Sequence, residues 1–280
     1  MSKMFTADTE TPICALQVAK HVSTLSDRQL KYAYHMSQAA WHGHRIVLAQ
    51  VSVESPAIFD FITTQFAAVD KNMSADDLLK IDPTGDKRSF LAYAAQFLGN
   101  CGNYQSFGDT KFVPGLSQQA LDALVEKSGN VKGQHLYAKC RDAMYALEPE
   151  SVRMLGYPGK QACSAYYSQN ISESEIALVQ AFLEARNVNA YNTRLFKDDV
   201  SGEFTVKLAS SEILPTETCK REGETIHIAY GDYAESMAKI VKSIEAAIEF
   251  SENDVQRQML EKYALSFKTG SIDAHKDSQR

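Results

Sequence analysis

The sequence GNCGNYQSFGDTKFVP, residues 99–114, joins two helical runs and carries the strongest local signal in this chain. It is longer than most connections in compact domains, and such a length indicates either a functional loop or disorder. Its glycines, Gly99, Gly102 and Gly108, allow a positive φ or a close approach to another part of the chain. Its aromatic residues must pack somewhere, which disfavours disorder. The segment therefore predicts an ordered loop, which either forms the wall of a ligand cleft or plugs its aromatic rings into the core.

Helical periodicity dominates the remainder of the chain. Ser74 precedes two aspartates, a pattern typical of a helix start. Ser172 and Glu175 form a candidate capping box. The spacing of apolar residues predicts helices over residues 26–50, 58–66, 176–186, 237–248 and 255–267. It also predicts a helix that begins after Ser117.

Strand signals are concentrated between residues 193 and 230. Apolar and polar residues alternate over 204–208 and again over 225–229. The segment between them, 210–221, contains Pro215 and several Ser and Thr residues, so we predict a loop there. Helices that flank a small antiparallel sheet make an α+β fold that is mainly helical.

Composition narrows the class of protein. A chain of 280 residues with 44% hydrophobic residues can build one large or two small domains. A net charge of −6 argues against nucleic acid or an anionic membrane as the main partner. No apolar run approaches the ~20 residues of a membrane span, and Asp8 and Glu10 precede any hydrophobic stretch, which is unlike a secretory signal. Five scattered cysteines are typical of reduced thiols, so we expect a cytoplasmic protein.

Residues 103–114, NYQSFGDTKFVP, resemble the N-terminal signature of the dipeptidyl peptidase III family of zinc-dependent exopeptidases. Further segments match that family in the same order, so that the resemblance spans nearly the whole chain: residues 32–41, 190–197, 231–234 and 270–276. Members of the family are several hundred residues longer than this chain.

The resemblance implies a fold and a metal site. It implies the five-stranded, barrel-like core of the family's lower lobe, with part of that core beyond Arg280. It also implies a zinc site built from a His-Glu-x-x-Gly-His helix and a second helix that supplies a carboxylate. None of the seven histidines here is followed by Glu, and no Glu-Glu pair occurs. We therefore expect residues 1–280 to be the N-terminal, substrate-binding lobe, incomplete at its C-terminal end, without the catalytic zinc lobe and without catalytic or metal-ligating residues.

The same resemblance implies that the loop lines the cleft between two lobes, which makes Ser106, Phe107 and Gly108 the candidate substrate-binding residues. A Phe ring can cover an apolar side chain, and Ser106 and the backbone of Gly108 can hydrogen-bond a peptide main chain. Tyr104 and Phe112 are expected to anchor the loop. The alternative is that Phe107 is itself part of the core.

Other polar residues of the sequence favour ordinary structural roles. Asp109 and Lys111 are most often a solvated or loop-bracing pair. His42 and His44 would point about 200° apart on a helix, so they cannot share a metal ion.

Two functions remain open. The first is the N-terminal part of a cytosolic zinc dipeptidyl peptidase that removes dipeptides from short peptides, with the missing catalytic lobe as its partner. The zinc would belong to the complete protein, and none would bind to this chain. The second is a stand-alone peptide-binding or regulatory module without catalysis. The coding sequence downstream of Arg280 would distinguish them.

Overall fold

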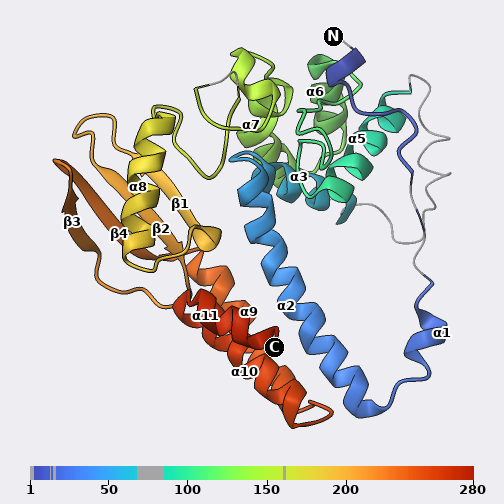
Figure 1. Cartoon of the computed structure of the whole chain (residues 1–280). Coiled ribbons are helices and arrows are strands. Elements are labelled where there is room, and N and C mark those ends of the chain that lie inside the picture. Colours follow the sequence, from blue (N-terminus) through green and yellow to red (C-terminus); the bar gives the residue numbers. More distant parts are fainter. Residues whose placement is uncertain (1–2, 13, 15–16, 68–84, 160–161) are drawn as a thin grey trace. The chain divides into compact units, whose positions relative to one another are not determined.

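The computed structural model describes residues 3–12, 14, 17–67, 85–159 and 162–280 (Figure 1). The predicted helix start at Ser74 lies outside these residues. The helices are α1 (Ala19–Val22), α2 (Asp27–Val51), α3 (Ser55–Ala67), α5 (Asp86–Asn100), α6 (Gln118–Lys127), α7 (Val131–Tyr145), α8 (Glu173–Ala185), α9 (Ala234–Ile248), α10 (Asp254–Thr269) and α11 (Ile272–Ser278). The strands are β1 (Thr193–Lys197), β2 (Phe204–Ala209), β3 (Glu217–Arg221) and β4 (Glu224–Asp232). The helices predicted over described residues are confirmed.

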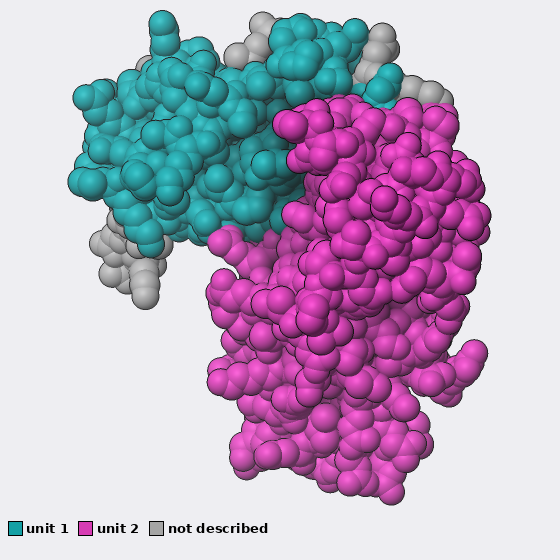
Figure 2. Space-filling model, turned by 90° about the vertical axis from the view of Figure 1, so that its left-hand side faces the viewer, with its two compact units in different colours: residues 1–14, 47–165 teal, residues 15–46, 166–280 magenta. Residues whose placement is uncertain are grey.

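The chain forms two compact units, which Figure 2 distinguishes by colour. Unit 1 comprises residues 1–14 and 47–165, and unit 2 comprises residues 15–46 and 166–280. Helix α2 contributes to both, since its residues up to Ile46 belong to unit 2 and the rest to unit 1.

Unit 1 is helical and has its own aromatic core. The ring of Phe61 on α3 lies 5.0 Å from that of Tyr137 on α7 and 5.7 Å from that of Phe90 on α5. Helix α6 begins after Ser117, whose Oγ accepts a hydrogen bond from the Ala120 N–H at 3.2 Å, as the sequence predicts. The core therefore holds α3, α5, α6 and α7 together and supports the segment that follows α5.

Unit 2 contains the sheet, with strand order β1-β2-β4-β3. Strand β2 pairs antiparallel with β1 and parallel with β4, while β3 and β4 form an antiparallel hairpin. The buried face of the sheet packs on α8 (Figure 1). Helices α9 and α10 and the first part of α2 form a second cluster in this unit.

Two expectations about the sheet are wrong. The core is not entirely antiparallel, because β4 returns from the β3 hairpin and inserts beside β2, so that β2 and β4 run in the same direction. Residues 210–221 are not all loop, since their last five residues form strand β3. This strand lies at the sheet edge and is mostly exposed, so its sequence lacks the apolar alternation of a buried strand.

Within the described residues, no helix has the length and apolar character needed to cross a membrane. All five cysteines lie in described parts of the chain, and none forms a disulfide.

Candidate functional site

The segment after α5 folds into a β-hairpin, residues 103–112, which we call the 103–112 hairpin. Helix α5 ends at Asn100, and the C-cap residue Cys101 is in the left-handed conformation with φ +53°. Gly102 then passes close to α2, where an added Cβ would lie 2.4 Å from Val51 Cγ1. Only glycine fits there without displacing a neighbour, so Gly102 serves close approach and Gly108, with φ +104°, serves the turn.

Backbone hydrogen bonds close the 103–112 hairpin. The Gln105 N–H donates to Thr110 O at 2.9 Å, and the Phe112 N–H donates to Asn103 O at 3.0 Å. Beyond these pairs, residues 106–109 form an exposed turn, which we call the tip. A further hydrogen bond, from the Ser106 N–H to Asn100 Oδ1 at 2.7 Å, ties the tip to the end of α5. The tip is therefore an ordered turn on the surface of unit 1.

A second chain segment pairs with the outer strand of the hairpin. The Lys111 N–H donates to Arg153 O, and the Leu155 N–H donates to Asp109 O, each at 2.9 Å. The strand that leaves the tip is thus hydrogen-bonded on both sides, to the strand that enters the tip and to residues 153–155.

The candidate substrate-binding residues all lie in the tip. Phe107 is 95% exposed, and Ser106 and Gly108 beside it are exposed as well. The alternative in which Phe107 belongs to the core is therefore wrong for this structure. Contact with a peptide stays a prediction.

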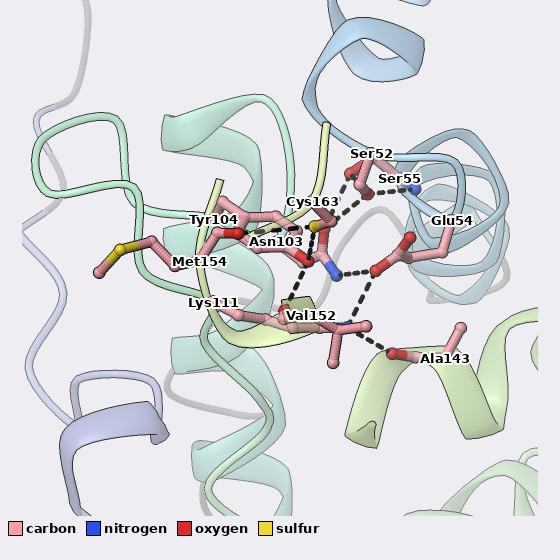
Figure 3. Close-up of polar contacts among 10 residues, drawn as sticks. All are labelled: Ser52, Glu54, Ser55, Asn103, Tyr104, Lys111, Ala143, Val152, Met154 and Cys163. Carbon is pink, nitrogen blue, oxygen red and sulfur yellow. Dashed lines mark hydrogen bonds and ion pairs between the residues drawn. The ribbon is translucent and has the colours of Figure 1, made fainter. Parts of the chain in front are cut away.

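Tyr104 and Phe112 anchor the hairpin, as the sequence predicts. Phe112 is fully buried, with its ring 5.7 Å from that of Tyr93. The Tyr104 hydroxyl donates to Val152 O at 2.7 Å and lies 3.4 Å from Cys163 Sγ (Figure 3). These rings hold the base of the hairpin in unit 1 and leave the tip outside.

Polar side chains also fix the base of the hairpin, beginning with Asn103, which is fully buried. Its Oδ1 accepts hydrogen bonds from Ser52 Oγ at 2.8 Å and from Ser55 Oγ at 3.0 Å. Its Nδ2 donates to Glu54 Oε1 at 2.9 Å (Figure 3). Ser52 and Glu54 lie in the turn between α2 and α3, and Ser55 is the first residue of α3.

Lys111, on the opposite strand of the hairpin, reaches the same carboxylate. Its Nζ lies 2.9 Å from Glu54 Oε1 and donates to Ala143 O on α7 at 2.9 Å (Figure 3). The Lys111 side chain is 2% exposed and that of Glu54 is 18% exposed. We call Ser52, Glu54, Ser55, Asn103 and Lys111 the Glu54 network.

The negative charge of the Glu54 carboxylate is stabilised by its partners within the network. Burial opposes ionisation of Glu54, but the Lys111 ammonium and the hydrogen bonds from Asn103 and Lys111 outweigh it, so the pKa of Glu54 is lowered. The expectation of a solvated or bracing pair between Asp109 and Lys111 is wrong. Lys111 is buried against Glu54, and Asp109 is exposed at the tip.

Sequence reasoning missed Glu54 and Asn103. Glu54 lies 57 residues from Lys111, and its position in a short turn gives no periodic signal. The one local pattern concerns Lys111 itself, which stands directly before the apolar residues of Phe112–Pro114; a lysine buried in such surroundings needs a partner, but the pattern does not identify Glu54 as that partner.

No metal centre accompanies the hairpin in the part of the chain that the structure describes, because no three His, Cys, Asp or Glu side chains there are grouped so as to hold an ion. The described residues therefore do not supply the set of three protein ligands that a catalytic zinc requires.

Comparisons with known proteins agree with the resemblance seen in the sequence. The family model described as peptidase family M49 matches residues 136–280. The dipeptidyl peptidase 3 of Dictyostelium discoideum is 38% identical over 271 residues, which cover 97% of this chain and 39% of that protein. The human dipeptidyl peptidase 3 is 37% identical over 289 residues, and this alignment covers 96% of this chain and 39% of the human protein.

The solved structure of DPP III from Caldithrix abyssi aligns with 90% of this chain, and the alignment covers 33% of the Caldithrix chain. The TM-score is 0.42 and the sequence identity is 14%. The chain thus spans about 39% of the length of the curated relatives that it matches.

Proposed function

Because the chain belongs to peptidase family M49, we propose that it is the N-terminal part of a zinc dipeptidyl peptidase that removes dipeptides from the N-terminus of short peptides. Relatives named dipeptidyl peptidase 3 match nearly all of this chain with 39% of their own length, which supports a partial enzyme. In this proposal residues 1–280 supply the substrate-binding lobe, and the zinc site lies in the remaining, catalytic lobe.

The observation that carries the peptide-binding role is the exposure of Phe107 on an ordered hairpin. An apolar ring that is 95% exposed buries almost no surface in the chain itself, so its apolar surface is available to contact a ligand. Ser106 and the backbone of Gly108 stand beside it as hydrogen-bonding groups. This set suits a short peptide with an apolar side chain, and its rigidity limits the entropy lost on binding.

The test is Phe107→Ala in the full-length protein encoded by the gene. The substitution should raise KM for a dipeptidyl substrate while the melting temperature stays close to that of the wild type, because the ring contacts ligand and not core. Val200→Ala is the control, since Val200 is 96% exposed in the turn between β1 and β2. Unchanged kinetics together with a large loss of stability would show that Phe107 is structural.

The alternative function is a stand-alone peptide-binding or regulatory module. It predicts the same effect of Phe107→Ala on peptide binding but no catalytic lobe in the gene product. Sequencing the transcript beyond codon 280 distinguishes the two. A continuing reading frame with a His-Glu-x-x-Gly-His motif supports the enzyme, and a stop codon supports the module.

We also propose a cytoplasmic location. Five cysteines without a disulfide support it. The net charge of −6 supports partners other than nucleic acid or an anionic membrane.

A further inference from the structure

One carboxylate oxygen holds both strands of the 103–112 hairpin. Asn103 Nδ2 and Lys111 Nζ both lie 2.9 Å from Glu54 Oε1. Asn103 is on the strand that enters the tip, and Lys111 is on the strand that leaves it. Glu54 itself belongs to the turn between α2 and α3, outside the hairpin. A single external atom therefore fixes the base of the hairpin on both sides.

Attachment of the hairpin to the core does not require this ion pair. Tyr104 and Phe112 are 3% and 0% exposed and already bury the base of the hairpin. A buried ion pair costs the hydration of both charges, and apolar residues of similar volume are often as stabilising. The Glu54 network instead fixes the orientation of the hairpin, because each of its hydrogen bonds has a required distance and angle.

Small rotations at the base have large effects at the tip. The tip begins three residues after Asn103, which is about 10 Å along an extended chain. A rotation of about 10° at the base then moves Phe107 by roughly 2 Å, and displacements of this size separate a packed contact from none.

We propose that Glu54, through Asn103 and Lys111, is the positioning residue of the peptide-binding tip, so that peptide affinity depends on a buried carboxylate that no peptide touches. This inference rests on the proposed function in that it takes Phe107 as the residue that contacts peptide. The Glu54 network sets the orientation in which Phe107, Ser106 and Gly108 are presented.

The first measurement tests positioning without any ligand. The double variant Glu54→Gln/Lys111→Met removes both charges and keeps the side-chain volumes similar. Hydrogen exchange at the Gln105 and Phe112 amides, which close the hairpin, should become at least tenfold faster. Exchange in α6, which none of these side chains contacts through a hydrogen bond, should not change. Unchanged exchange at both hairpin amides would overturn the proposal.

Two further variants keep this measurement decisive. Asp122→Asn is the control, since Asp122 pairs with Arg141 at 2.7 Å and accepts a hydrogen bond from Tyr137, and both partners lie on α7, outside the hairpin. It should leave hairpin exchange as in the wild type. Should the double variant not fold, Asn103→Ala, which keeps the Glu54–Lys111 ion pair and removes one of the two links to Glu54, should give faster exchange in the same amides.

The second measurement links the network to Phe107. A fluorescein-labelled pentapeptide with a free N-terminus and apolar side chains is titrated into residues 1–280, and its Kd is read from anisotropy. The double variant should raise Kd about tenfold, as should Phe107→Ala. Combining the two should give no further loss, because the network acts through the ring. Additive losses would overturn the positioning role.

Failure of the proposed function has a different signature. The peptide-binding role of the tip is overturned if the wild-type chain binds no peptide. It is also overturned if the wild type and Phe107→Ala bind the peptide with the same Kd. The exchange comparison still decides by itself whether the Glu54 network holds the hairpin.

Discussion

At the scale of one residue, Glu54 shows why removing one partner of a buried ion pair affects stability differently from replacing both partners. Its carboxylate is mostly buried and accepts hydrogen bonds from Asn103 and from Lys111. Removing one charge leaves the other buried without its partner, whereas removing both also removes the cost of desolvation.

Lys111→Met alone should therefore destabilise the chain strongly. We expect a loss of about 3–5 kcal/mol in the free energy of unfolding, the typical cost of leaving a buried charge unpaired. The double variant Glu54→Gln/Lys111→Met should lose much less. Urea denaturation of the three proteins measures both differences. If the double variant were as unstable as the single one, the ion pair itself would be a net source of stability.

The lowered pKa of Glu54 predicts how acid acts on the chain. The folded-state pKa lies below the unfolded value of about 4.3. The contribution of Glu54 is complete above that value and is lost as pH falls through the folded-state pKa, because the unfolded chain binds the proton first.

The melting temperature of the wild type should thus fall more steeply below about pH 4.3 than that of Glu54→Gln. Other carboxylates with lowered pKa, such as Asp122, titrate in both proteins and cancel in the comparison. Parallel curves for the two proteins would contradict the lowered pKa of Glu54.

The residue scale also shows what the sequence could predict of the candidate site. The anchoring of Tyr104 and Phe112 follows from their apolar character and is confirmed. The partner of Lys111 could not be predicted, since Glu54 is 57 residues away and only the packing of α3 and α7 brings it near.

At the scale of elements, α8 illustrates a structure that local sequence specifies well. The Ser172 N–H donates to Glu175 Oε2 at 2.8 Å, and the Glu175 N–H donates to Ser172 Oγ at 3.3 Å. This is the capping box that the sequence predicts, and all its members lie within one helical turn.

Ser172→Ala should cost about 1 kcal/mol, the usual value of a helix N-cap. The loss leaves the Glu175 N–H without its acceptor at the start of α8. Thermal or urea unfolding measures it. Ser174→Ala is the comparison, since it removes a hydroxyl that lies 3.1 Å from Ser172 Oγ but keeps the bond from the Glu175 N–H to Ser172 Oγ, and it should cost less. Equal losses in the two variants would show that the cap does not stabilise α8.

The sheet marks the limit of local prediction. Strand β2 has a clear alternation, with Phe204 and Val206 buried, and it was predictable. Strand β3 was not, because an edge strand with mostly exposed side chains has the composition of a loop. The parallel pairing of β2 with β4 depends on where the β3 hairpin inserts, which no short segment of sequence encodes.

At the scale of the whole molecule, the chain has separate apolar cores, and the residues that the structure describes include no cluster suited to a catalytic zinc. Units 1 and 2 each bury their own apolar clusters. No histidine of the sequence is followed by Glu, and no group of potential ligands occurs in the described part of the chain.

We therefore predict that purified residues 1–280 release no dipeptides. The assay is turnover of a dipeptidyl chromogenic substrate with added zinc, with a full-length dipeptidyl peptidase 3 relative as the positive control. Turnover that zinc supports and a chelator abolishes would contradict the prediction and require a metal site within this chain.

The exposed ring of Phe107 has a consequence for proteolysis. Chymotrypsin cleaves after aromatic residues, but it must bind several residues around the bond in an extended form. A fixed tip does not supply that form unless the hairpin opens locally. The rate of cleavage after Phe107 therefore depends on how often the base of the hairpin opens. A protease then detects, from outside the molecule, whether the buried contacts of Glu54 are intact.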